Sequence, residues 1–229
     1  MGGETNFRDR LDLLYCAYKS DRDPAKKPIK LSEIKELIKK MYYCEIAEDE
    51  EADDIISRYQ YLSSKEVGKY IVISPDKDCK QTPGFVYKKK KDEIRNCSGF
   101  GYIELVVKKS ASGSNSYKID GVGRCFFYYQ LIVGDPVDSY SPFKPTKTPY
   151  RFYQEFKDIK NDKEAWQYVY NSYKAYFGAI EEWTRWDGKV VKGDIIDLIQ
   201  VYVDVVHMIR WNEDSINVRD VLNKMEVIL

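Results

Sequence analysis

Three short acidic segments carry the residue types best suited to metal chemistry in this chain. Residues 51–54 read Glu-Ala-Asp-Asp, residues 76–78 read Asp-Lys-Asp, and residues 135–138 read Asp-Pro-Val-Asp. At an effective dielectric near 20, two carboxylates about 4 Å apart repel by roughly 4 kcal/mol. Seven carboxylates in one crevice would therefore cancel much of a domain's net stability of about 5–15 kcal/mol. Either the segments are apart in space or cations join them, and oxygen-only ligands suit magnesium or manganese.

The neighbouring apolar segments indicate how these acids are held. Residues 70–73 form a short apolar run, which predicts a strand buried on both faces. In open α/β sheets ligands bind beyond the carboxyl ends of the strands, which is where residues 76–78 would lie. Residues 51–54 open a predicted helix, and residues 135–138 follow an apolar, aromatic stretch, 123–133, that predicts a buried helix. Acids are also favoured at a helix N-terminus by the helix dipole, but this alternative explains only the first segment.

Composition excludes several other classes of site. The chain has 229 residues, enough for one sizeable core, and its 37 acids balance its 37 bases. The single histidine excludes most histidine-based metal or nucleophile sites, and five scattered cysteines without C-x-x-C spacing predict reduced thiols of a cytoplasmic protein. No signal peptide and no apolar run long enough to span a membrane is present.

The order of the acidic segments resembles that of the phage-type 5′–3′ exonucleases, relatives of the flap endonucleases with a PIN-like nuclease fold. That family has an E-A-D-D segment, an x-D-K-D segment after a strand and a G-D-x-x-D segment, matched here by residues 51–54, 74–78 and 134–138. An F-R … Y-K-x-x-R pattern at residues 7–22 and Gln-Leu at residues 130–131 agree. The resemblance covers residues 6 to about 140 well and the remainder loosely.

The resemblance implies an α/β fold: a PIN-like parallel-sheet region at residues 1–138 and a helical region at residues 139–229. It implies metal-dependent hydrolysis of DNA from a 5′ end or flap, in phage DNA replication or degradation in the host cytoplasm, with two magnesium or manganese ions. Metal ligands would be Glu51, Asp53, Asp54, Asp76, Asp78, Asp135 and Asp138. Lys19 would stabilise charge on the scissile phosphate and Arg22 would clamp it, whereas the residues alone, without the resemblance, favour a solvated basic patch. Nucleic acid would contact Arg8, Lys19, Arg22, Lys144 and Lys147.

Two departures from the family leave three hypotheses open. The family's helix–three-turn–helix element has glycine-rich turns, whereas residues 139–146 contain prolines and no glycine. The family also has two acidic strands ahead of the segment that matches residue 1, so we expect an N-terminally truncated or split nuclease. The chain is then an active nuclease, a catalytically impaired DNA-binding or assembly protein, or an enzyme completed by a second polypeptide that supplies these strands.

Periodicity predicts the remaining elements. Apolar residues at helical spacing predict an amphipathic helix over residues 31–41, followed by a short strand at 42–46. Residues 102–107 and 117–119, separated by a turn-rich stretch, predict a β-hairpin. Residues 161 onward are predicted to be helical, and His207 is expected to pack inside the helix of residues 195–211.

Overall fold

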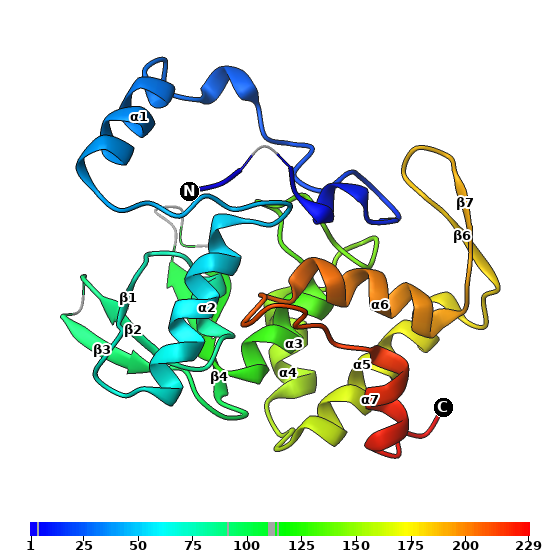
Figure 1. Cartoon of the computed structure of the whole chain (residues 1–229). Coiled ribbons are helices and arrows are strands. Elements are labelled where there is room, and N and C mark those ends of the chain that lie inside the picture. Colours follow the sequence, from blue (N-terminus) through cyan, green and yellow to red (C-terminus); the bar gives the residue numbers. More distant parts are fainter. Residues whose placement is uncertain (4, 91, 110–112, 114) are drawn as a thin grey trace.

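Three small β-sheets and seven α-helices make up the chain in a computed structural model that describes all residues except 4, 91, 110–112 and 114. The α/β class predicted from the sequence is confirmed at this general level. Figure 1 shows the sheet of β1–β3 under α2 on one side of the molecule and the helices α3 to α7 gathered on the other.

The first sheet places the second acidic segment. β1 (Val72–Ile73) pairs in parallel with β2 (Phe85–Lys88), and β2 pairs antiparallel with β3 (Glu93–Asn96). α2 (Ala52–Lys65) covers one face, where Val72 and Val86 are buried. Burial of the 70–73 run on both faces was a wrong prediction, because β1 is an edge strand and nothing in the described chain covers its other face. Ile71 and Ile73 are accordingly 44% and 69% exposed.

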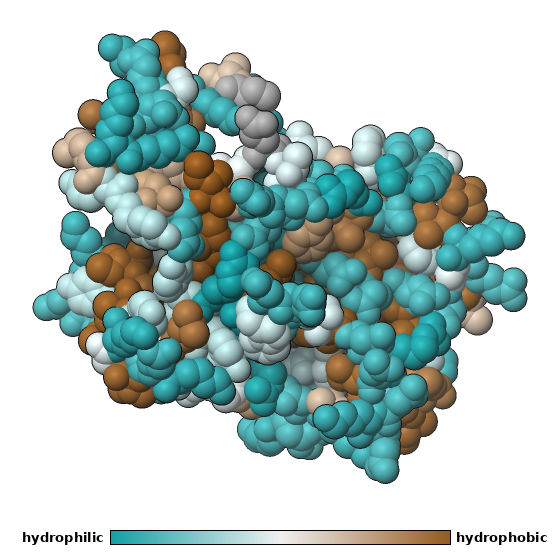
Figure 2. Space-filling view, in the orientation of Figure 1, coloured by the Kyte–Doolittle hydropathy of each residue, from teal (hydrophilic) through white to brown (hydrophobic). Residues whose placement is uncertain are grey.

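The amphipathic helix was predicted correctly, but its apolar face has no partner. α1 (Leu31–Met41) buries no residue, and Ile34, Leu37 and Met41 are all exposed. Figure 1 shows α1 set apart from the other helices, and Figure 2 shows apolar side chains on the surface in this region. Residues 42–46 form no strand among the described residues, and this stretch instead meets the N-terminus, with the Met1 ammonium donating to the Glu45 carbonyl and the Ala47 N–H donating to the Met1 carbonyl at 2.9 Å.

The N-terminal segment contains little regular structure. Residues 7–23 contain one short 3-10 helix, η1 (Phe7–Arg10). A second 3-10 helix, η2 (Pro24–Lys26), begins just after them. Asn6 caps η1 by accepting a hydrogen bond from the Arg8 N–H at 3.1 Å. The chain between the two helices is a series of turns, which carries Lys19 in a left-handed conformation with φ 55°.

The predicted hairpin and the buried helix after it are both confirmed. β4 (Tyr102–Lys109) pairs antiparallel with β5 (Asn115–Val122), and most of the predicted turn lies outside the described residues. α3 (Arg124–Val133) follows directly and is buried along nearly its whole length. Its C-terminus delivers the third acidic segment to the same region as α2 and β1.

The C-terminal half is helical, with one hairpin that was not predicted. Its elements are α4 (Pro149–Phe156), α5 (Asp162–Phe177), β6 (Glu182–Thr184), β7 (Val190–Lys192), α6 (Ile195–Val206) and α7 (Val218–Lys224). α6 ends earlier than expected, so His207 is its C-cap residue, buried as predicted but outside the helix. The main core joins these helices to α3 and to Leu13 and Tyr18, so it crosses the expected boundary at residue 138.

Candidate metal centre

The first acidic segment forms the N-terminus of α2. Glu51 is the N-cap residue, and its backbone N–H donates to Asp54 Oδ2 at 2.9 Å. Acids in this position are stabilised by the positive end of the helix dipole. The Glu51 carboxylate is further held by Asn6 Nδ2 at 3.0 Å and by the Tyr18 hydroxyl at 3.1 Å. Its position is therefore fixed by three separate parts of the chain.

The second segment turns sharply at the carboxyl end of β1. The Asp76 N–H donates to Ser74 Oγ at 3.1 Å, and the Asp78 N–H donates to Asp76 Oδ1 at 2.9 Å. Asp78 then begins η3 (Asp78–Lys80), with its side chain buried. The two carboxylates thus lie beyond the end of a parallel strand, as the sequence predicted.

The third segment is a tight loop closed by a β-bridge. The Asp135 N–H donates to the Tyr140 carbonyl at 2.9 Å and the Tyr140 N–H returns to the Asp135 carbonyl at 3.1 Å. Gly134 allows this closure, because it has φ 79° and a Cβ there would collide with the Tyr140 carbonyl. The loop holds Asp135 and Asp138 in buried positions.

The second and third segments converge on one point. Asp78, Asp135 and Asp138 each offer a carboxylate oxygen, and the three oxygens lie within 4.8 Å of one another. Oxygens bound to one magnesium or manganese ion at about 2.1 Å would lie within about twice that distance of each other. Three carboxylates with no nitrogen or sulfur ligand therefore fit a hard divalent cation after modest contraction.

The pKa values of the acids show how closely their charges approach. Burial, followed by the charge of Asp76, raises the pKa of Asp78 to about 7. Burial and then the charges of Asp76 and Glu51 raise the pKa of Asp53 to about 6. Burial also raises the pKa of Asp138, although Lys19 and Arg22 oppose it. Asp76 therefore lies close enough to both Asp78 and Asp53 to raise their pKa values, and it connects the first acidic segment to the converging carboxylates.

Side-chain cations already join several of these acids. Lys19 forms an ion pair with Glu51 and lies 3.8 Å from Asp138, and Arg22 donates to Asp138 at 2.6 Å. Lys77 forms an ion pair with Asp135. Among the described residues, no ion pair involves the acids Asp53, Asp76 and Asp78. The site thus retains excess negative charge where the second segment meets the others.

Two of the predicted site residues have a different role. Arg8 is fully buried and cannot reach nucleic acid from this position, because its guanidinium binds Asp54 through two hydrogen bonds of 2.6 and 3.0 Å. Both Asp54 oxygens are thereby occupied, and one also accepts the Ile209 N–H at 3.0 Å. Burial alone would raise the pKa of Asp54, but Arg8 lowers it below the ordinary value. The pair is structural, and Asp54 lacks the free oxygen that a metal ligand needs.

Gln130 and Lys77 contact the acids directly, although neither was predicted to be a site residue. Gln130 Nε2 donates to Asp78 Oδ1, and Gln130 Oε1 accepts from Gln81 Nε2 at 2.9 Å. The signal available in the sequence was one amide within an apolar, aromatic helix, since a buried amide requires partners.

Lys144 and Lys147, two of the predicted nucleic-acid contacts, lie away from the acids. Lys144 is over the Tyr15 ring, and Lys147 binds Glu155.

Comparisons with known proteins add no identification. No protein-family model, curated protein or solved structure matches this chain. None of the helices in the described part of the chain has the length and apolar character needed to cross a bilayer.

Proposed function

We propose that this protein is a metal-dependent nuclease of the PIN-like 5′ nuclease type, acting on DNA with a 5′ end or flap. The observation that carries the proposal is the convergence of Asp78, Asp135 and Asp138 from two segments almost sixty residues apart. Asp76 adds charge beside Asp78 and also acts on Asp53, so these five carboxylates together would hold one or two divalent ions. Bound magnesium or manganese would supply an activated water and neutralise charge on the departing oxygen.

The residues at the rim of the site suit a phosphodiester substrate. Arg22 is half exposed while bound to Asp138, so its remaining N–H groups can reach a phosphate beside the acids. Lys19 lies between Glu51 and Asp138, where its charge would stabilise a phosphate held by the metal. The acids would thus hold the metal, while the two cations orient the phosphate and offset its charge.

The α1 segment supports a single-stranded substrate. This helix presents exposed apolar side chains together with Lys35, Lys39 and Lys40, and Figure 1 shows it set apart from the other helices. Apolar side chains can contact bases while lysines contact phosphates, a combination typical of binding to single strands. The predicted DNA contacts at Lys19 and Arg22 fit this path, whereas Arg8 does not.

Cleavage of labelled DNA tests the proposal. The chain is incubated with 5′-tailed DNA in magnesium or manganese, and Asp135→Asn is compared with Asp158→Asn, which changes an exposed acid paired only with Lys157. We expect digestion to require metal, to be lost in Asp135→Asn and to be retained in Asp158→Asn. Digestion that persists equally in both variants would contradict the assignment of the site.

A specific observation also favours a second candidate, a non-catalytic DNA-binding or assembly protein. Lys19, Arg22 and Lys77 already neutralise part of the acidic cluster, so the fold has a means of tolerating it without metal. Such a protein would bind 5′-tailed DNA with similar affinity in metal and in EDTA. It would cleave none under any of the conditions above.

The open edge of β1 supports the third hypothesis, a nuclease completed by another polypeptide. Among the described residues no strand pairs with the outer edge of β1. Ile71, just before β1, and Ile73, within it, are exposed apolar side chains. Natural edge strands are usually short, charged or covered, because unpaired backbone groups attract other strands. β1 is short but neither charged nor covered, so an added strand would bring its side chains beside Asp76.

A further inference from the structure

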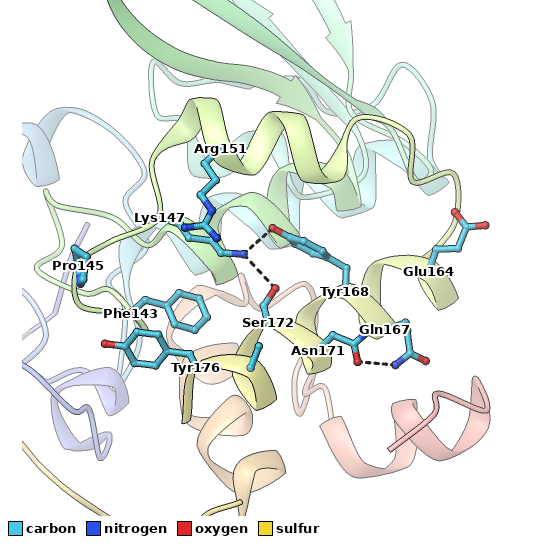
Figure 3. Close-up of a pocket in the computed structure, with 11 residues that line it drawn as sticks. Phe143, Pro145, Lys147, Arg151, Glu164, Gln167, Tyr168, Asn171, Ser172 and Tyr176 are labelled. Atoms are coloured by element: carbon cyan, nitrogen blue, oxygen red, sulfur yellow. Dashed lines mark hydrogen bonds between the residues drawn. The ribbon is translucent and has the colours of Figure 1, made fainter. Parts of the chain in front are cut away.

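A separate pocket lies between the loop after Phe143, α4 and α5, and Figure 3 shows its lining. Its volume is about 640 Å³, within the range of small-molecule sites. Its lining combines aromatic rings, amides and cations with a single carboxylate, that of Glu164. The residues that line it include Phe143, Lys147, Arg151, Glu164, Asn171 and Tyr176.

One end of the pocket is positively charged. Lys147 Nζ binds Glu155 at 2.7 Å and Tyr168 at 3.2 Å, with a longer contact of 3.4 Å to Ser172. Arg151 binds Glu155 only through Nε, at 2.9 Å, and its side chain is 69% exposed. Burial would raise the pKa of Glu155, but hydrogen bonds from Lys147 and Arg151 lower it to about 2. Two cations therefore share one carboxylate, which leaves a net positive charge with free guanidinium N–H groups.

The opposite wall is aromatic and rigid. The Phe143 and Tyr176 rings meet edge to face with centroids 5.2 Å apart. The Tyr176 hydroxyl accepts the Lys144 N–H at 3.1 Å and donates to the Lys144 carbonyl, so the ring cannot swing away. Figure 3 shows both rings on one side of Lys147. Tyr176 keeps enough exposed surface to stack against a planar ligand.

The remaining polar groups set the direction of binding. Asn171 Oδ1 accepts Gln167 Nε2 at 3.1 Å, so the Asn171 NH2 group is the part available to a ligand. The Glu164 carboxylate accepts the Lys160 N–H at 2.9 Å and Asn161 Nδ2 at 2.8 Å, at the far side of the pocket from Phe143 in Figure 3. Its charge would repel an anion, which favours the anion near Arg151 and Lys147.

We propose that this pocket binds a nucleoside phosphate, with the phosphate on Arg151 and Asn171, near the charge of Lys147, and the base against Tyr176 and Phe143. The shared chemistry is one nucleotide, which can be free in solution or part of a single strand. A neighbouring hollow of about 320 Å³ shares Phe143 with the pocket and reaches Ser139, beside Asp138 of the acidic site. A strand leaving the acids would thus have a route to the pocket, but nucleotide binding there needs no catalysis.

Binding measured in EDTA tests this site separately from the nuclease proposal. The probes are fluorescently labelled AMP and a labelled oligothymidylate, titrated with the full chain by anisotropy. Arg151→Ala and Tyr176→Leu change partly exposed residues, and Arg219→Ala is the matched control, an exposed arginine paired with Asp194 and Asp197. We expect at least tenfold weaker binding in the first two variants and unchanged binding in the control.

The two probes distinguish the source of the nucleotide. Variant-sensitive binding of AMP indicates a free nucleotide, and variant-sensitive binding of the oligonucleotide alone indicates a strand. Absence of binding by both probes, or binding that Arg151→Ala and Tyr176→Leu leave unchanged, overturns the proposal. Binding of AMP in EDTA involves no cleavage, and cleavage is measured separately in magnesium or manganese, so failure of either proposal is recognised on its own.

Discussion

Arg8 and Asp54 form an ion pair in which neither side chain has any exposed surface. The Arg8 guanidinium also donates to the carbonyls of Val205 and His207, at 3.0 and 2.6 Å. The pair therefore ties η1 and the first turn of α2 to the end of α6. It holds the N-terminal segment, which carries Lys19 and Arg22, against the helical half of the molecule.

Breaking this pair should destabilise the fold without removing a metal ligand. Arg8→Met leaves a buried carboxylate and two carbonyls without their donor, for which we expect a loss of about 3–5 kcal/mol in the free energy of unfolding. Arg10→Met on the same 3-10 helix removes only an exposed pair with Asp49 and should cost less than about 1 kcal/mol. Urea denaturation measures both, and equal losses would contradict the structural role.

Asp54 provides the complementary test. Asp54→Asn should destabilise the fold but leave metal affinity of the folded protein close to that of the unaltered chain. Asp135→Asn should weaken metal binding much more. Calorimetric titration with manganese compares the two variants. A larger loss of manganese affinity in Asp54→Asn than in Asp135→Asn would show that Asp54 is a metal ligand.

Stability without metal should decrease as pH rises through the range in which Asp53 and Asp78 ionise. Their pKa values are raised to about 6 and about 7, so the folded state binds these protons more tightly than the unfolded chain. Their contribution to stability is therefore complete below about pH 4 and lost by about pH 7. For Asp78 alone the difference is roughly 4 kcal/mol at 1.36 kcal/mol per unit.

Metal should reverse this loss, because a cation favours the ionised carboxylates. We expect magnesium or manganese to raise the melting temperature more at pH 8 than at pH 5.5, with release of protons on binding. Asp76→Asn combined with Asp135→Asn should raise the melting temperature in EDTA at pH 8 by relieving repulsion. A melting temperature that is the same with and without metal at both pH values would show that the acidic cluster binds no metal.

Gln130 should tune the metal site through Asp78. Its amide donates to the Asp78 carboxylate and so opposes the rise in the pKa of that group. Gln130→Leu should weaken manganese binding about tenfold at pH 7. The loss should shrink at pH 8.5, where Asp78 is ionised in either protein. A deficit independent of pH would indicate a packing defect rather than lost support of the carboxylate.

The contrast between Gln130 and Arg8 shows what the sequence can predict of this site. The acids were found because their spacing follows a strand or a helix end, and local chain geometry then determines which way they point. Burial of Arg8 depends on carbonyls almost two hundred residues away, which no local pattern records. The prediction that residues 70–73 are buried on both faces was wrong for the same reason, since burial of the second face depends on a covering layer, and the described residues supply none.

The amphipathic helix α1 makes the same point. Its period correctly predicted a helix, because spacing is a local property. Spacing alone does not predict whether the apolar face of a helix is covered by the protein core or by a ligand. Here nothing in the described chain does, and the face is open to solvent.

Lys19 and Arg22 should govern DNA affinity. Replacing both with alanine should weaken binding to 5′-tailed DNA and reduce the slope of log K against log salt by about 1.4, at about 0.7 for each contact with a single strand. Replacing the four lysines of residues 88–91 should have a smaller effect. Fluorescence anisotropy at several salt concentrations gives both slopes. A larger effect from residues 88–91 than from Lys19 and Arg22 would indicate that DNA binds along β2 and the neighbouring hairpin instead.

The purified chain should be a weak nuclease that an added polypeptide strand improves. No strand in the described part of the chain pairs with the outer edge of β1, which leads to Asp76, so a strand that pairs there could place a further acid at the metal site. Without it, metal affinity and water positioning should both be poor, whereas DNA binding through Lys19 and Arg22 should survive. We therefore expect slow digestion by the chain alone and faster digestion with a polypeptide carrying two acidic strands.

A change at the edge itself separates pairing from unrelated activation. Ile73→Lys adds a charge to an exposed position of β1 and should abolish both complex formation and the gain in digestion, while Ile94→Lys, equally exposed but on β3, serves as the control. Light scattering follows the complex and gel electrophoresis follows the DNA. Fast digestion by the chain alone, abolished by Asp76→Ala, would show that its own acids suffice. Intact DNA binding without any gain from the polypeptide would instead favour the non-catalytic protein.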